Sequence, residues 1–408
     1  MRSEHRSNQE GRQHASSMKK PPLRYFRVEN FKAIRESGRV EFGWLTALIG
    51  NNGSGKSSLV EALETFRDIV KDGVEPAFRR WRGFEHVLNK SRERKFAERA
   101  SHRPAFDAPL RFCFDWNLRT HLTGQQSITQ GPIGDTLFIQ QEQMIERRKG
   151  RTERWTRNDR GEVTFATAAE AGPCADAVPL PELAGGESIL KRFAPELFDR
   201  WQFLMLNPER MGQPVSSRME GAVTLARDGA NIAEYLDDFL VKDPDGFEDM
   251  LDAIRHVLPY ASNLQPARTS EPQRASYLKL GENGFDIPGW SISRGTLRIV
   301  ALLACLRHPS PPALLVVEEV ENGLDPRTLN MLVEEIRAAI TLGTTQVILT
   351  THSPYLLDLL ALEHIVVVER IDGEPVFTRP NKEELASWAE SFSPGRLYTM
   401  GRLTRNDR

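Results

Sequence analysis

Short apolar runs separated by turn residues mark the beginning of the chain as β-rich. Apolar and polar positions alternate or cluster in three of these runs, which predicts strands at residues 25–31, 38–42 and 45–50. The period then becomes helical from residue 56 to about residue 70, because apolar side chains recur on one face at Leu59, Leu63 and Phe66. An apolar strand therefore leads directly into a helix near residue 50.

Toward the C-terminus the pattern is again that of alternating strands and helices. Three continuous apolar runs predict fully buried parallel strands at residues 313–317, 346–350 and 364–368. A helix is predicted over about 327–340, because Leu329, Leu332, Val333, Ile336 and Ile340 follow the i, i+3, i+4, i+7 spacing. Strand, helix and strand together predict a βαβ unit.

The middle of the chain is less regular. A strand is predicted at 109–118, followed by a polar stretch that contains a β-like run at 162–167. A helical run is predicted over residues 188–206. Two further helical segments, at 231–240 and 247–258, are separated by a break at Pro244 and Gly246.

These patterns predict an α/β fold in which two pieces of one domain flank a long insertion. The N-terminal piece covers residues 23–72, the mixed α/β insertion 73–285, and the C-terminal piece 286–408. Residues 1–22 are polar and lack the apolar segment of a signal peptide, so we expect a disordered tail there.

Composition changes this picture little. With 39% hydrophobic and 27% charged residues, a sizeable core is expected, and a net charge of −2 excludes a protein that is basic over its whole surface. The three cysteines, Cys113, Cys174 and Cys305, are too widely spaced for a disulfide framework or a zinc site, which favours a reducing cytoplasm. No apolar run reaches the roughly 18 residues of a membrane span, so no membrane partner is expected.

The junction between the strand at 45–50 and the following helix carries a phosphate-binding motif. Residues Gly50 to Ser57 read GNNGSGKS, which fits G-x-x-x-x-G-K-[ST] in the strand-to-helix context that the motif requires. Its glycines let backbone N–H groups face phosphate oxygens. We expect ATP to bind here, at Gly50, Asn51, Asn52, Gly53, Ser54, Gly55, Lys56, Ser57 and Ser58. Lys56 would reach the β- and γ-phosphates, and the Ser57 hydroxyl would bind Mg²⁺.

Two carboxylates end the apolar strand at 313–317. A carboxylate at the C-terminal end of a parallel strand beside such a loop meets the metal and the γ-phosphate. Glu318 is therefore the predicted Mg²⁺ ligand, and Glu319 the predicted general base that polarises the attacking water. Read alone, the pair could equally be two exposed charges at a strand end.

A histidine ends the next strand in the same way. His352 follows the run at 346–350, where it could hydrogen-bond the γ-phosphate, although a lone histidine is more often structural. A second phosphate-binding sequence, SISRGT, begins at residue 291. Its small residues at the start of an apolar helix offer N–H groups to an anion, and Ser293 is also a simple N-cap candidate.

The order of these motifs resembles that of the ABC-type ATPases: P-loop, S-x-G signature, acidic strand, GLD loop and switch histidine. Local phrases resemble the compact RecF-like/SMC-like ATPases, relatives of the ATPase half of overcoming-lysogenization-defect proteins. These phrases are VENFKAI, LARDGANIAEYL, ISRGTLRIVALL, EEVENGLDP and the C-terminal segment from Asp372. Two positions depart from that pattern, Val320, where proline is frequent, and Arg294, where a small or polar residue is common.

The resemblance implies an ATPase that dimerises around two ATP molecules. The signature of one chain then contacts the γ-phosphate held by the other, which assigns Ser293, Gly295 and the GLD-loop residue Asp325 to nucleotide binding. It also explains why one chain needs two phosphate sites. The glutamine-containing loop of such ATPases has only weak candidates, Gln140 and Gln141.

Two basic runs lie in the insertion. Residues 78–103 hold nine Lys or Arg against three acids, and residues 147–160 hold seven against two. Trp81, Phe84 and Trp155 lie among these charges, as in some nucleic-acid-binding segments. Contact with DNA or RNA is one interpretation; a solvated loop or a face for an acidic protein is the other.

Three classes of function remain open. The first is the ATPase of a defence-type system that drives a separately encoded effector, such as a Toprim-type nuclease, because the segment after His352 is too short to hold that domain. The second is a RecF-like DNA repair ATPase, since the insertion lacks the heptads of a long coiled coil. The third is a transporter subunit, which is least favoured because the P-loop and the signature lie so far apart.

Overall fold

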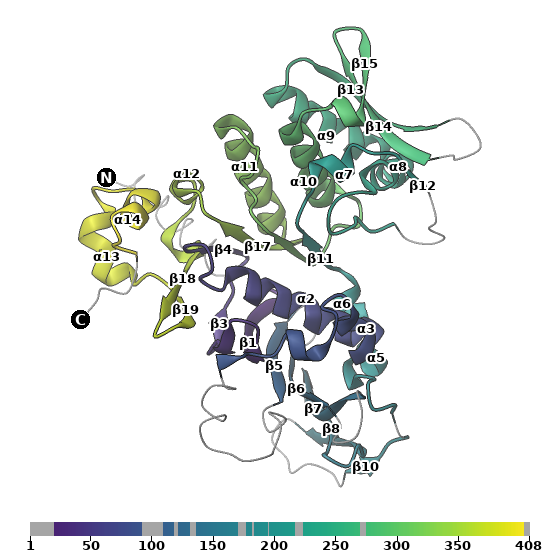
Figure 1. Cartoon of the computed structure of the whole chain (residues 1–408), viewed down its shortest axis with the longest axis vertical. Helices are drawn as coiled ribbons and strands as arrows, with labels where there is room; N and C mark the ends of the chain where they lie inside the picture. Colours follow the sequence, from purple (N-terminus) through teal and green to yellow (C-terminus); the bar gives the residue numbers. More distant parts are fainter. Residues whose placement is uncertain are drawn as a thin grey trace, which may run out of the picture.

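The structure is a computed structural model. It describes residues 20–91, 109–117, 121–130, 136–169, 177–181, 183–194, 196–216, 223–269 and 275–403. Residues 1–19 of the predicted tail and Cys174 lie outside the described residues. The described residues form three sheets, which are joined by helices into an elongated molecule (Figure 1).

A six-stranded sheet in the middle of the molecule combines strands from the N- and C-terminal pieces of the chain. Its order is β11–β16–β17–β4–β18–β19, and all strands but β19 are parallel to their neighbours. The strands are β4 (Leu45–Ile49), β11 (Trp201–Leu204), β16 (Leu314–Val317), β17 (Gln346–Thr351), β18 (Ile365–Ile371) and β19 (Glu374–Thr378). Every residue of β4, β16 and β17 is buried, as expected where helices cover both faces. The α/β class and the predicted C-terminal strands are confirmed.

Strand β11 corrects the sequence analysis. The helical run predicted over 188–206 is wrong at its end, because the chain forms α5 (Ile189–Phe193), α6 (Glu196–Asp199) and then β11. β11 pairs in parallel with β16 along its whole length, and three of its four side chains are buried. A short apolar run fits a buried strand as well as a helix by periodicity. The free hydrogen-bonding edge of β16 decides between them.

A nine-stranded antiparallel sheet forms one end of the molecule. It contains β1 (Leu23–Phe31), β2 (Ile34–Glu36), β3 (Val40–Glu41), β5 (Leu110–Asn117), β6 (His121–Gln130), β7 (Leu137–Arg148), β8 (Arg151–Arg157), β9 (Val163–Ala169) and β10 (Val178–Pro179). The predicted strands at 25–31, 109–118 and 162–167 correspond to β1, β5 and β9. Strands β6 to β8 were not predicted, because one face of an antiparallel sheet can remain in water and its strands can be largely polar.

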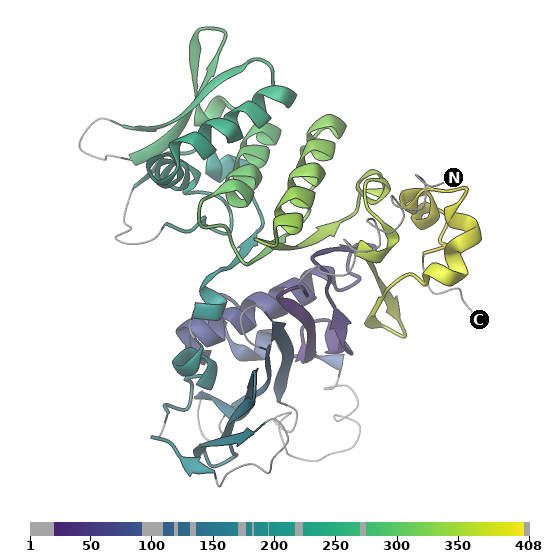
Figure 2. The same ribbon diagram turned by 180° about the vertical axis from the view of Figure 1, so that it is seen from behind.

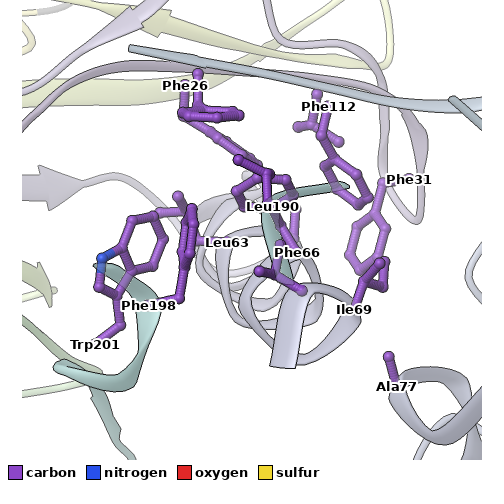
Figure 3. Packing of buried hydrophobic residues seen from close by; sticks show 14 of the residues in the cluster. Phe26, Phe31, Leu63, Phe66, Ile69, Ala77, Phe112, Leu190, Phe198 and Trp201 are labelled. Carbon is purple, nitrogen blue, oxygen red and sulfur yellow. The ribbon is translucent and has the colours of Figure 1, made fainter. Parts of the chain in front are cut away.

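Helix α2 (Lys56–Asp72) lies between the antiparallel and the parallel sheet. Its Phe66 packs among aromatic rings from both sides, with ring centroids 5.2 Å from Phe114, 5.5 Å from Phe112 and 5.6 Å from Phe198. Figure 3 shows this cluster around Phe66. Packing on two sheets fixes the position of α2, and its first residue, Lys56, belongs to the P-loop.

The opposite face of the parallel sheet is covered by helices of a second lobe. These are α7 (Pro208–Met211), α8 (Ile232–Lys242), α9 (Pro244–Val257), α10 (Arg294–Arg307) and α11 (Pro326–Leu342). A third sheet, of β12 (Val215–Ser216), β13 (Ala261–Arg268), β14 (Ala275–Glu282) and β15 (Phe285–Pro288), packs on α8 and α9 (Figure 2). Helix α9 begins at Pro244, before the predicted residue 247, because Asp243 caps it through the N–H of Gly246.

The C-terminal segment packs against residues of β4 and β18 in the parallel sheet. It contains α12 (Pro354–Asp358), α13 (Lys382–Ala389) and α14 (Pro394–Thr399). Gly395, the second residue of α14, lies so close to α12 that a Cβ atom there would be 2.0 Å from the carbonyl oxygen of Pro354. The Gly395 N–H donates to Asp358 Oδ1 at 2.6 Å. The segment is therefore attached directly to the helix that follows His352.

The range 73–285 is distributed over all three sheets. Its first part extends the antiparallel sheet from β5 to β10, residues 201–204 add an edge strand to the parallel sheet, and residues 208–288 build most of the second lobe. The N- and C-terminal pieces share the parallel sheet, since β4 lies between β17 and β18.

Candidate functional site

The loop after β4 has the backbone of a phosphate cradle. Gly53 and Gly55 adopt left-handed φ values of 74° and 115°, which favour glycine. At Gly50 there is no room for a side chain, because a Cβ atom would lie 2.1 Å from the carbonyl oxygen of Val368. At Gly55 a Cβ atom would lie 2.7 Å from the ring of Pro375 in β19. The β18–β19 hairpin thus closes one side of the loop.

Lys56 folds back over this loop. Its side chain is buried, and its Nζ donates to the carbonyl oxygens of Gly50 at 2.7 Å and Asn51 at 3.1 Å. Burial lowers the pKa of Lys56, while the nearby carboxylates Glu319 and Glu321 act in the opposite direction. The ammonium group therefore lies between the phosphate loop and the carboxylates that follow β16.

Ser57 and Glu318 meet as the metal prediction requires. The Ser57 hydroxyl donates to the Glu318 carboxylate, and Glu318 is only 5% exposed. Burial raises the pKa of Glu318, whereas Arg227 and the Ser57 hydrogen bond lower it. A hydroxyl and a carboxylate are oxygen ligands of the kind that Mg²⁺ prefers. The donor set fits Mg²⁺, and these two residues would hold it.

Glu319 is positioned through its backbone. It has a left-handed φ of 49°, its N–H donates to Thr350 Oγ1 at 2.9 Å, and its carbonyl oxygen accepts from Arg298 Nη2 at 3.0 Å. Its side chain is exposed and accepts a short hydrogen bond from Asn322. A left-handed residue other than glycine or asparagine is uncommon. Here the contacts on both sides of the peptide hold it, and they turn the carboxylate outward at the strand end.

His352 follows β17, next to the Glu318–Glu319 strand. Its side chain is exposed, and its backbone N–H donates to Glu321 Oε1 at 2.6 Å. Glu321 was not predicted as a site residue, although it is the third acid of the same loop. It joins the loop after β16 to the loop after β17, so the general-base candidate and the histidine are held in one arrangement.

Ser293 caps α10. Its Oγ accepts from the N–H of Thr296 at 3.1 Å, and the residue is exposed. Gly295 lies against the GLD loop, since a Cβ atom there would be 2.3 Å from the carbonyl oxygen of Gly323. Asp325 caps α11 through the N–H groups of Arg327 and Thr328, and the hydrogen bond from the Thr328 hydroxyl is the main reason for its lowered pKa. All three residues have structural contacts within the chain.

The strand order brings some predicted residues together and leaves others apart. The carboxyl ends of β4, β16 and β17 place the P-loop, Glu318, Glu319 and His352 at one edge of the parallel sheet. Ser293 and Gly295 belong to the second lobe, and their described contacts are with Thr296 and Gly323 rather than with the P-loop. This edge of the sheet therefore gathers the phosphate loop, the two candidate carboxylates and His352, without the signature.

Gln140 and Gln141 do not belong to this site. Both lie in β7 of the antiparallel sheet, where Gln141 Nε2 donates to Asp159. The segment that does lie at this edge of the parallel sheet is the end of β11, which is followed by Met205, Leu206 and Asn207. The sequence analysis did not place this segment at the site, because it assigned residues 201–204 to a helix.

Arg227 and Arg298 were also missed. Arg227 Nη2 lies 2.7 Å from Glu318 Oε1, and Arg298 donates to the carbonyl oxygens of Leu206 at 3.2 Å and of Glu319 at 3.0 Å. Both lie within phrases that carry the family resemblance, Arg227 in LARDGANIAEYL and Arg298 in ISRGTLRIVALL. Their position within these two phrases was the sequence feature that could have indicated a role at the site.

Two of the three aromatic residues singled out in the basic runs belong to the core. Trp155 and Phe84 are buried, and Trp155 packs on Phe165 and Phe193. Trp81 donates through Nε1 to Thr65 and lies between Lys32 and Arg80. Trp155 and Phe84 are therefore not available to stack on a base, while contact of the basic runs with nucleic acid stays a prediction. Residues 92–103 of the first run lie outside the described residues.

A cavity of about 240 Å³ adjoins the first half of the P-loop. It is lined by residues 50–54, the end of β18 at 367–370, and Tyr398 of α14. The P-loop therefore borders the C-terminal segment on this side. Within the described residues, no helix has the length and apolar character needed to cross a membrane.

Comparison with known proteins identifies the family of this chain. Residues 84–358 match the family model described as "AAA domain, putative AbiEii toxin, Type IV TA system", and residues 22–98 match an "AAA ATPase domain" model. A curated relative, the Nod factor export ATP-binding protein I of Sinorhizobium fredii, is 28% identical over 169 residues. That alignment covers 40% of this chain, which spans about half of the relative, 46%.

Among solved structures, an SMC head bound to the C-winged helix domain of ScpA has a similar fold. The TM-score is 0.52 at 14% identity, and the match covers 90% of this chain and 100% of that one. At this identity the likeness is one of fold, and it agrees with the split parallel sheet and the P-loop described above.

Proposed function

Because the chain belongs to the AAA-domain family described as putative AbiEii toxin of type IV toxin–antitoxin systems, and is thus an ATPase of the ABC and SMC type, we propose that it hydrolyses ATP as a dimer around two nucleotides. The observation that carries this proposal is the separation of the two phosphate sites. P-loop, Glu318, Glu319 and His352 share one edge of the parallel sheet, while the capped N-terminus at Ser293 is exposed on another lobe. A second chain would supply the missing signature.

Each residue of the proposed site has a defined task. Lys56 neutralises the β- and γ-phosphate oxygens, and the P-loop N–H groups cradle them. Magnesium, held by Ser57 and Glu318, would supply positive charge beside the phosphates. Glu319 accepts a proton from the attacking water, and His352 donates a hydrogen bond toward the γ-phosphate. From the partner chain, Ser293 and the N–H of Gly295 complete the γ-phosphate site, with Asp325 in the loop beside them.

Ser293→Arg is expected to leave ATP binding by the isolated chain nearly unchanged and to abolish ATP-induced dimerisation together with hydrolysis. The reason is geometric, since a long charged side chain at the start of α10 occupies the position of the partner's γ-phosphate. Light scattering with ATP in a Glu319→Gln background measures the dimer, and steady-state phosphate release measures turnover. Ser291→Arg is the matched control, because Ser291 is also exposed and lies just before the capped helix.

Mixing two inactive chains sharpens this test. Lys56→Ala supplies an intact signature, and Ser293→Arg supplies an intact P-loop, so a mixed dimer holds one composite site with both parts intact. Partial recovery of hydrolysis is expected unless the two sites are strictly coupled. A Glu319→Gln chain that stays monomeric with ATP, together with normal hydrolysis by Ser293→Arg, would exclude the two-nucleotide dimer and leave Ser293 as a helix cap.

We further propose that the ATPase drives a separately encoded effector in a defence-type system, with a Toprim-type nuclease as the first candidate. The toxin–antitoxin description of the matched family supports such a setting. Co-purification from native cells with the Glu319→Gln chain, which should accumulate with ATP bound, tests the proposal. Recovery of the ATPase alone in every nucleotide state would count against it. A transporter role, which the name of the curated relative suggests, predicts a membrane protein in the same experiment.

A DNA-binding role remains the second candidate, because the β7–β8 hairpin presents exposed cations. Arg147, Arg148, Lys149, Arg151 and Arg154 are exposed there, and only Arg148 and Arg151 form described ion pairs, with Glu146 and Glu153. Of the earlier run, Arg80 is not available, since it pairs with Glu64 and Asp68. The hairpin is therefore one described surface that fits phosphate contacts, and Arg79 and Arg82 of the earlier run are exposed as well.

Charge reversal at Arg147 and Arg148 is expected to weaken DNA or RNA binding without changing basal ATP hydrolysis. Loss of two phosphate contacts should reduce the slope of log K against log salt concentration by about 2. Reversal of Arg268 and Lys279 on the second lobe is the control for net charge. Binding that is insensitive to salt, or absent in every nucleotide state, would favour a protein partner for this hairpin instead.

A further inference from the structure

Arg227 connects the metal pair to the interior of α2. Its Nη2 lies 2.7 Å from Glu318 Oε1, and its Nε lies 3.1 Å from Glu64 Oε2. Glu318 and Glu64 are both buried, whereas the Arg227 side chain is 38% exposed. One guanidinium thus neutralises two buried carboxylates, and one of these is the predicted Mg²⁺ ligand.

The Glu64 end of this bridge is firmly held. Besides Arg227, Glu64 contacts Arg80 at 2.9 Å and Arg67 at 3.6 Å, and both arginines also pair with Asp68. Glu64 therefore keeps its charge compensated whether or not Arg227 moves. At the other end, among the described ion pairs, Glu318 has Arg227 as its cationic partner. A metal ion would replace the guanidinium there with a larger charge.

The loop that carries Arg227 is joined to the end of β11. The N–H groups of Met205 and Asn207 donate to the carbonyl oxygens of Arg227 and Asp228, at 2.8 and 2.9 Å. Asn231 braces the loop from within, through the N–H of Ala226 at 2.7 Å and the carbonyl oxygen of Thr224 at 2.9 Å. The backbone of Arg227 and Asp228 is therefore hydrogen-bonded directly to residues 205–207.

Residues 205–207 in turn contact the signature helix. Arg298 of α10 is buried, and it donates to the carbonyl oxygens of Leu206 and Glu319. A continuous set of hydrogen bonds thus runs from Glu318 through Arg227 and the end of β11 to α10, which begins just after Ser293. Coupling through such a network needs an element with two arrangements. Arg227 bound to both carboxylates is one arrangement, and Arg227 bound to Glu64 alone would be the other.

We propose that Arg227 occupies Glu318 only while magnesium is absent, and that Mg²⁺ arriving with ATP displaces it and reports the occupied site to the signature helix. The inference rests on the proposed function, because it takes Ser57 and Glu318 as the metal residues. Its cause is competition between two cations for one carboxylate oxygen. Arg227 then stays on Glu64, and its loop shifts against residues 205–207. Arg227 is a positioning residue for Glu318, not a catalytic one.

Two measurements on Arg227→Gln test this proposal. The free Mg²⁺ concentration that half-activates ATP hydrolysis is expected to fall about fivefold, the effect of removing a partly exposed ion pair that competes with the metal. Hydrogen exchange of the Met205 and Asn207 amides is the second readout. In the Glu319→Gln background it should rise on addition of ATP with Mg²⁺ but not of ATP with a chelator, and Arg227→Gln should abolish that magnesium-dependent change.

Arg210→Gln is the matched control, because Arg210 forms an exposed ion pair with Asp228 of the same loop at 2.7 Å and does not contact Glu318. Arg227→Lys keeps a cation and should retain part of the competition, which makes the test independent of any folding defect in Arg227→Gln. An unchanged or higher magnesium requirement in both Arg227 variants, with wild-type amides insensitive to Mg²⁺, would overturn the proposal. If the wild-type chain shows no magnesium-dependent hydrolysis at all, the proposed function fails instead.

Discussion

Replacing Lys56 by alanine is expected to reduce ATP turnover on the order of 10³-fold, to the background of the assay. The ammonium group lies between the P-loop carbonyl oxygens and the carboxylates after β16, where it would meet the phosphate charge. Without it, the negative charge that develops during phosphoryl transfer has no partner at this position. Steady-state phosphate release is the measurement, with thermal unfolding to show that the variant is folded.

Lys71→Ala is the matched control for this change. Lys71 lies in the last turn of the same helix and pairs with Asp199 at 3.3 Å, far along α2 from the P-loop. It removes the same charge from the same element, and turnover should stay near the wild-type rate. Hydrolysis near the wild-type rate in Lys56→Ala would refute the assignment of the nucleotide site.

Glu319→Gln is expected to keep ATP and Mg²⁺ bound while hydrolysis falls about 10²–10⁴-fold, because an amide cannot accept a proton from water. The substitution should leave the local fold intact. Glu319 is held by its backbone, through Thr350 and Arg298, and glutamine keeps the side-chain oxygen that accepts from Asn322. Single-turnover hydrolysis and retention of labelled ATP on the protein distinguish slow chemistry from weak binding.

Glu318→Gln is the comparison that separates the two carboxylates. Glu318 is buried against Ser57 and Arg227, so its amide should weaken magnesium-dependent ATP binding rather than trap the nucleotide. If Glu318→Gln instead binds ATP and cannot cleave it, while Glu319→Gln hydrolyses normally, the roles of metal ligand and general base are exchanged.

Much of the fold followed from local patterns. The glycines, lysine and serine of residues 50–57 predict a strand-to-helix phosphate loop, because positive φ angles and a helix start depend on neighbouring residues only. The buried strands of the C-terminal piece and α11 were likewise confirmed, since continuous apolar runs and a 3.6-residue period are visible within a short window. Placing Glu318 and Glu319 at the end of a strand likewise required only the apolar run that precedes them.

Other features depended on partners far away in the chain. The run WQFL is a strand because β16 offers it a free edge, and β6 to β8 are strands although they are polar, because their neighbours pair with them. Trp155 and Phe84 could not be told from exposed rings among charges until the core closed around them. Burial and strand pairing are properties of the assembled chain, which no window of residues contains.

The candidate site likewise combines features that are visible in local sequence with features that depend on residues far apart in the chain. Residue type and local spacing indicate the candidate chemistry, because a phosphate loop, two carboxylates, a histidine and a capped second helix are each visible within a short stretch of sequence. The arrangement of these groups in space depends on the fold. The fold places Arg227 between Glu64 and Glu318, which lie 163 and 91 residues away from it, and it places Ser293 on the second lobe, at the start of α10. The reason is that a charge pair of this kind is specified by the packing of α2, β16 and the 224–231 loop, whereas a turn or a helix cap is specified by its own few residues.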